Sequence, residues 1–225
     1  MNRNMRKTVC ALMILVSMAW SGKMNAQAFE YPDYPDRDKI AVSYQGSRPT
    51  ISDFVTAYLN YVMENKDFYE KSYDELYVGV YESWNKFKQQ KPLADNVSLT
   101  ADVRNGYMHY ERVNAEPGDT IVWEMCFWNC ADGKQKLVCA NAVWKMQGDY
   151  GATDGSTFLV YENAKKTMRF IYEEDVDALY DGDGLSVFFL PRKGKDIRVS
   201  AAGSGERWNE ILKWNGYKFS SYTVE

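Results

Sequence analysis

The feature that most constrains the fold is a change in hydrophobic period near residue 97. Before that point apolar residues recur at helical spacing, and after it they alternate at the two-residue spacing of strands. Three hairpin signals punctuate the second part, at Asn105-Gly106, Asp132-Gly133 and Asn215-Gly216. The sequence therefore predicts an α+β fold with two N-terminal helices packed on a long antiparallel β-meander.

Two segments ahead of the change carry helix-start signals. A capping-box pattern at Thr50 precedes an amphipathic helix expected over residues 51–66. A second capping box at Ser72 precedes a helix expected over residues 74–90. Residues 29–48 lack either period and are interpreted as an extended leader, so residues 49–225 are expected to form a single domain.

The meander is expected to run through residues 97–224. Its predicted strands cover residues 97–104, 107–114, 120–129, 135–145, 156–162, 167–173, 184–190, 196–201, 209–214 and 217–223. A sheet of this many strands avoids exposed edges by closing or by doubling over. Both a barrel-like closure and a sandwich agree with the pattern.

The first 28 residues have the pattern of an export signal. A basic start with Arg3, Arg6 and Lys7 precedes an apolar run over residues 9–20, and small residues offer cleavage after Ala26 or Ala28. The run is shorter than the roughly 20 residues that span a bilayer. The protein is therefore predicted to be exported, either periplasmic or secreted, and soluble, with no membrane span in the mature chain.

Charge argues against nucleic acid as a partner. The formal net charge of the full chain is −4. Cleavage of residues 1–28 would remove four basic residues and no acidic one, which gives a mature chain of −8. A net acidic surface repels phosphate backbones.

Three cysteines would remain after cleavage. A turn centred on Asp132-Gly133 places Cys126 opposite Cys139 in a non-hydrogen-bonded pair, close enough for a disulfide in an exported protein. A Cys126–Cys139 disulfide is the favoured interpretation. Three buried free thiols are the main alternative, and a catalytic or metal-binding role is the least favoured.

The residues that support chemistry are sparse, and no catalytic residue is assigned. The single histidine, His109, is expected opposite Asp102, where a surface contact is favoured over a catalytic pair. One histidine leaves no multi-histidine zinc site. The acidic cluster at residues 173–183 ends in Asp181 and Asp183, which are candidate calcium ligands, but a solvated acidic loop between strands is the favoured interpretation. No other cofactor is expected.

Aromatic residues offer the best candidate binding surface. In an exposed row, tryptophan rings would stack on sugar faces, whereas on an inner face they would be core. The candidates are Trp123, Trp128, Trp144, Trp208 and Trp214.

Four segments together resemble a known group of proteins: residues 103–107, 128–134, 190–197 and 212–219. With the signal and the helical lead-in, the chain resembles uncharacterised secreted proteins of about 200 residues from anaerobic gut bacteria. The resemblance implies an exported, mostly β protein, and it supplies no catalytic residue and no substrate.

Together these observations favour a non-catalytic exported binding or interaction protein, with a glycan or another protein as its partner. The alternative is a small carboxylate-dependent hydrolase such as a glycosidase. Its carboxylates would come from the cluster at residues 173–183 or from Asp102 with His109.

Overall fold

A computed structural model describes residues 39–65, 71–114, 119–146, 149–171, 173–178, 186–201 and 208–224. The predicted signal peptide and the first part of the predicted leader lie outside the described residues. Within the described ranges, no helix has both the length and the apolar character needed to cross a membrane.

In the described part of the chain, two helices lie between the first and second strands, α2 (Ile51–Glu64) and α3 (Lys71–Lys88). Helix α2 begins where the sequence predicts, and the backbone N–H of Thr50 donates to Oδ2 of Asp53 at 2.7 Å, as the capping-box pattern requires. Helix α3 begins three residues before its predicted start and ends two residues before its predicted end. The apolar stripes of both helices face the same core.

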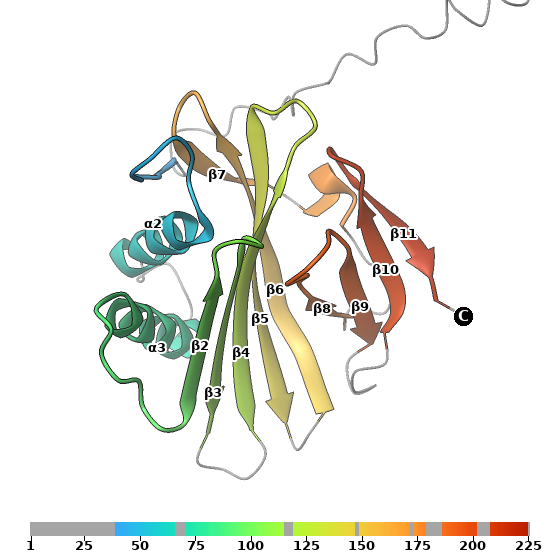
Figure 1. Cartoon of the computed structure of the whole chain (residues 1–225). Helices are drawn as coiled ribbons and strands as arrows, with labels where there is room; N and C mark the ends of the chain where they lie inside the picture. Colours follow the sequence, from blue (N-terminus) through green and yellow to red (C-terminus); the bar gives the residue numbers. More distant parts are fainter. Residues whose placement is uncertain are drawn as a thin grey trace, which may run out of the picture. The chain divides into compact units, whose positions relative to one another are not determined.

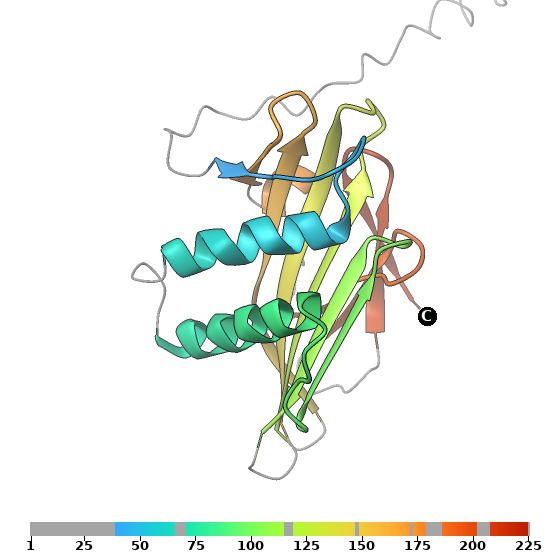
Figure 2. The ribbon, with the colours of Figure 1, turned by 60° about the vertical axis from the view of Figure 1, so that its left-hand side comes forward.

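A large antiparallel sheet forms a half-barrel, with the strand order β1-β7-β6-β5-β4-β3-β2 (Figures 1 and 2). Its strands are β1 (Ile40–Ala41), β2 (Val97–Asp102), β3 (Tyr107–Val113), β4 (Thr120–Asn129), β5 (Gln135–Met146), β6 (Asp149–Glu162) and β7 (Thr167–Ile171). The two-residue strand β1 lies within the predicted leader and was not foreseen. Strand β6 begins seven residues before its predicted start.

A second, smaller antiparallel sheet follows a 3₁₀ turn at Glu173–Val176. Its strands are β8 (Ser186–Phe189), β9 (Ile197–Ala201), β10 (Trp208–Trp214) and β11 (Phe219–Thr223), in the order β11-β10-β9-β8. The predicted α+β class with a large antiparallel β-sheet is confirmed.

The two faces of the large sheet have different coverings. Helices α2 and α3 cover one face, where Tyr58 stacks on Trp123 with ring centroids 6.2 Å apart (Figure 2). The small sheet covers the opposite face, where the indole N–H of Trp128 donates to the carbonyl of Lys195 at 2.8 Å. Because successive side chains of a strand point to opposite faces, β4 contributes to both cores.

The two sheets differ in strand length. Strands β4, β5 and β6 have 10, 12 and 14 residues, whereas β8 and β9 have 4 and 5. At the β4–β5 turn the sheets meet, since the N–H of Ala131 donates to the carbonyl of Gly216 at 3.0 Å. Further along, the side-chain amide of Asn141 donates to the carbonyl of Phe188 at 2.7 Å. The short strands therefore leave the β4 start and the β5 end only partly covered.

The first and third predicted hairpin turns are centred one residue away from their true positions. Asp102 pairs with Tyr107 across a loop of four residues, so His109 pairs with Thr100 rather than with Asp102. The Asp102 carboxylate accepts the N–H of Asn105 at 3.2 Å, which stabilises the longer loop. Likewise Trp214 pairs with Phe219. The predicted two-residue loops are wrong at these two turns.

The predicted Cys126–Cys139 disulfide is wrong. The two residues are directly paired, as the sequence predicts, but both are buried free thiols, as is Cys130. The N–H of Cys130 bonds to the carbonyl of Gln135, and counting from this bond makes Cys126 and Cys139 a hydrogen-bonded pair. Such pairs hold their Cβ atoms about 5.5 Å apart, wider than the roughly 3.5–4.5 Å of a disulfide.

Candidate functional site

The register of β3, β4 and β5 brings separated polar residues together on the face that looks toward the small sheet. His109 pairs with Glu124, and Glu111 pairs with Val122. Thr120 at the start of β4 pairs with Lys145 near the end of β5. These side chains form three adjacent rows at the part of the sheet that the short strands leave uncovered.

Glu124 is held by donors from three directions. Its Oε1 accepts the phenol O–H of Tyr107 and lies 3.5 Å from Nδ1 of His109. Its Oε2 accepts the N–H of Leu190, just after β8, at 3.2 Å. The side chain is only 10% exposed, and a buried carboxylate is tolerated when its lone pairs are satisfied in this way. Glu124 therefore has a fixed position between the two sheets.

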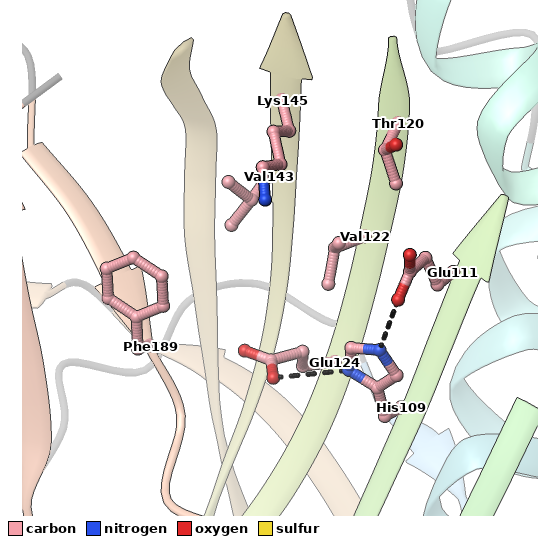
Figure 3. Close-up of a pocket in the computed structure, with 8 residues that line it drawn as sticks. All are labelled: His109, Glu111, Thr120, Val122, Glu124, Val143, Lys145 and Phe189. Carbon is pink, nitrogen blue, oxygen red and sulfur yellow. Dashed lines mark hydrogen bonds and ion pairs between the residues drawn. The ribbon is translucent and has the colours of Figure 1, made fainter. Parts of the chain in front are cut away.

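His109 stands between two carboxylates. Its Nε2 lies 3.4 Å from Oε2 of Glu111, and its Nδ1 faces Glu124 (Figure 3). Burial lowers the pKa of His109, but the hydrogen bonds and charges of Glu124 and Glu111 raise it, and the net pKa lies above the ordinary value. The doubly protonated imidazole has an acceptor for each N–H, which is the physical cause of this preference.

Beside these groups lies a pocket of about 250 Å³. Val122, Val143 and Phe189 give it apolar walls, and Thr120 and Lys145 line the side away from Glu124 (Figure 3). Glu111 is 41% exposed, so one carboxylate of the pocket is open to solvent while the other is buried. Pockets that combine apolar walls with a few fixed polar groups are typical ligand sites.

Tyr107 extends the hydrogen-bonded chain inward. Burial and the adjacent Glu124 carboxylate raise the pKa of Tyr107 far above its ordinary value. The phenol therefore remains a donor to Glu124 at any physiological pH. Its oxygen also lies 3.3 Å from Nδ1 of His109, so Tyr107, Glu124 and His109 hold one another in place.

Comparison with protein-family models, with curated proteins and with solved structures finds no match to this chain.

The four tryptophans of the predicted platform whose side chains the structure describes do not form an exposed row. Trp123 is buried under the helices, and Trp128 and Trp214 are buried between the sheets. Trp144 is half-buried and packs against the helix-side core. Trp123 and Trp128 lie on opposite faces of the large sheet because they are an odd number of residues apart on β4. The side chain of Trp208 lies outside the described part of the structure.

The other predicted site residues lie away from the pocket. Asp102 contacts Nε of Arg192 at 3.3 Å rather than His109, and the hydrogen bonds of Asn105 and then Arg192 lower its pKa. Asp181 and Asp183 lie outside the described residues, so the calcium prediction stays a prediction. Across the described residues, no group of three or more histidine, cysteine or acidic side chains could hold a metal ion.

Sequence reasoning missed Glu111, Glu124, Lys145 and the role of Tyr107. One signal was present: Glu124 is the single charged residue of strand β4, and all of its neighbours between the two polar ends of the strand are apolar. A charge in such a strand is rarely buried unless it is paired, so it marks a functional or specific contact. His109 and Glu111 also share one face of their strand because they are two residues apart.

Proposed function

We propose that this protein is an exported, non-catalytic binding protein and that the Glu124–His109 pocket is its ligand site. The observation that supports this most is the fixed carboxylate of Glu124 beside a pocket of about 250 Å³ with apolar walls. Buried polar groups that are held in place before a ligand arrives reduce the entropy lost on binding. Export is supported by the basic and apolar pattern of residues 1–28.

The size of the pocket favours a small ligand. Sites for drug-sized molecules occupy roughly 300–1,000 Å³, and this pocket is below that range. Its lining supplies hydrogen-bond acceptors at Glu111, donors at Lys145 and Thr120, and apolar contact at Phe189. Three of the tryptophans that favour a glycan, Trp123, Trp128 and Trp214, are buried and cannot stack on a sugar, so the pocket is the better guide to the ligand class.

A pocket-filling variant tests the ligand site. Val122 is half-buried in the pocket wall, and Val122→Phe would place a ring in the cavity. Ligands found in a thermal-shift screen of sugars, organic acids, amines and amino acids should lose their stabilising effect in Val122→Phe. Val78→Phe is the matched control, because Val78 is 37% exposed on helix α3, which covers the opposite face of the large sheet, and does not line the pocket. Ligand shifts that persist in Val122→Phe would place the binding site elsewhere.

A carboxylate-dependent hydrolase is the second candidate. Glu111 and Glu124 line the same pocket, and each carboxylate lies within 3.5 Å of a nitrogen of the same imidazole, His109. Glycosidases use carboxyl pairs at roughly 5–10 Å. Here, however, the imidazole of His109 lies between the two carboxylates, where a substrate bond would have to sit. Hydrolysis of chromogenic glycosides that disappears in both Glu111→Gln and Glu124→Gln would favour this candidate over binding alone.

A further inference from the structure

We propose that the pocket binds a small zwitterion, with its ammonium group beside Glu111 and its carboxylate beside Lys145 and Thr120. The inference rests on the proposed ligand site and adds the chemical class of the ligand. It follows from the opposite charges at two sides of one small cavity.

The register sets the separation of the two charged poles. Glu111 is on β3 and Lys145 on β5, with β4 between them. Glu111 pairs with Val122, which pairs with Val143, two residues before Lys145. At standard strand spacings the two Cα atoms are about 12 Å apart. Both side chains line the same pocket, so their charged ends approach it from different sides.

The negative pole is Glu111 rather than Glu124. Glu124 is buried and already accepts from Tyr107 and Leu190 and faces His109. Among the described residues, the Glu111 carboxylate has one ionic contact, to His109, and it is the more exposed of the two. It therefore retains lone pairs that an incoming ammonium group could occupy.

The positive pole is Lys145, whose ammonium group points into the pocket near Val143 (Figure 3). Lys145 also has a further interaction within the protein, so a ligand carboxylate would be one of its partners rather than its sole partner. The hydroxyl of Thr120, on the neighbouring strand, adds a second donor on this side. A carboxylate accepts from both kinds of donor.

The wall between the poles is apolar. Val122, Val143 and Phe189 contribute hydrocarbon surface to the pocket. A small aliphatic or aromatic part of the ligand would therefore be buried there, and its burial would add to the affinity. An amine alone or an acid alone would leave one pole without its partner.

Calorimetric titration of the full chain with leucine, γ-aminobutyrate and phenylalanine tests the inference. The single-pole analogues of leucine are isoamylamine, which lacks the carboxylate, and 4-methylpentanoate, which lacks the ammonium group. We expect at least one of the three zwitterions to bind. That zwitterion should bind at least tenfold more tightly than its own amine, which lacks the carboxylate, and than its own acid, which lacks the ammonium group. Equal affinities for a zwitterion and its amine would overturn the inference.

Charge-removing variants assign the poles. Lys145→Met should weaken the affinity for the zwitterion at least tenfold and leave the affinity for the amine unchanged. Glu111→Gln should also weaken the affinity for the zwitterion, but it should leave the affinity for the acid unchanged. The matched controls are Lys193→Met and Glu82→Gln, which change exposed residues outside the pocket. If a variant does not fold, the analogue comparison in the unmodified protein still decides.

The failures of the two proposals are distinguishable. If another small molecule binds, is blocked by Val122→Phe, and no zwitterion binds, the ligand class is wrong and the site stands. If zwitterions bind equally well to Val122→Phe, both the site and the inference are wrong. If no compound of the screen binds, both proposals fail.

Discussion

At the scale of single residues, the site is organised around one buried charge. Glu124 interrupts an apolar strand, and it is accommodated because Tyr107, His109 and Leu190 all present donors to it. Removing one hydrogen-bond partner of a buried charge lowers the free energy of unfolding by more than that hydrogen bond contributes, because the remaining buried group is left without a partner. The partners of Glu124 are thus expected to matter for stability as well as for binding.

Tyr107→Phe tests this dependence. The variant keeps the ring and deletes the hydroxyl that donates to Glu124. We expect the free energy of unfolding to fall by about 1–3 kcal/mol. Urea denaturation measures it. Tyr222→Phe is the control. Because Tyr222 is 51% exposed, removing its hydroxyl should change the free energy of unfolding by no more than about 0.5 kcal/mol. Equal effects of the two substitutions would show that the Tyr107 hydroxyl does not support the carboxylate.

His109 should make stability depend on pH. Its folded-state pKa lies above the ordinary value, so its contribution is fully present below about pH 6.5 and is lost as the pH rises through the folded-state pKa. The stability advantage of the wild type over His109→Gln should therefore be larger at pH 5.5 than at pH 8.5. Denaturant titrations at both values measure it. Because His109 is the only histidine, no other imidazole contributes. An advantage that grows with pH would contradict the assignment.

At the scale of elements, the helix-start pattern and the alternation of strands predicted most of the fold. The start of α2 and both bounds of β4 are as expected, because capping and alternation are local properties. Loop length is less local. The Asp102 carboxylate and Gly106 stabilise a loop of four residues. His109 therefore pairs with Thr100 rather than with the predicted Asp102. The Glu124–His109 pair depends instead on how β3 aligns with β4, and alternation alone gives the faces of these strands but not their alignment.

Gly106 and Gly133 allow a matched test of turn geometry. Both have positive φ, +69° and +66°, but only a Cβ at Gly106 would meet another atom, Cε1 of Phe127 at 2.7 Å. Gly133→Ala should cost about 1–2 kcal/mol from the left-handed conformation alone. Gly106→Ala should lower the free energy of unfolding by about 1–3 kcal/mol more than Gly133→Ala does, because Phe127 already packs against Phe54 and has little room to move. Thermal unfolding compares them, and equal losses would mean that Phe127 moves aside freely.

At the scale of the whole molecule, the sequence left open how the meander closes. The strands were predicted as one series, yet the pairing separates them into two sheets between β7 and β8. The predicted break between those strands covered residues 174–183, which is no longer than the predicted gap at residues 146–155, where β5 and β6 in fact pair within one sheet. A long connection lets a chain leave one sheet and begin another, but alternation alone does not show that it does so.

The export prediction also belongs to this scale. In a bacterial host with two membranes, the mature protein should begin at Gln27 or Phe29, as measured by intact mass and N-terminal sequencing. Ile14→Arg places a charge in the apolar run and should leave the chain uncleaved in the cytoplasm. A full-length wild-type chain in the cytoplasmic fraction would refute export.

Because the two sheets have strands of unequal length, the residues that line the pocket are different from the residues that form the two cores. The cores under the helices and around Trp128 involve neither Thr120 nor Lys145 nor Glu111, which stand where the long strands extend past β8. Strand length thus determines where a ligand binds, and the side chains of Thr120, Lys145 and Glu111 determine which ligand binds. Exchanging those side chains would retune recognition while both cores keep their packing.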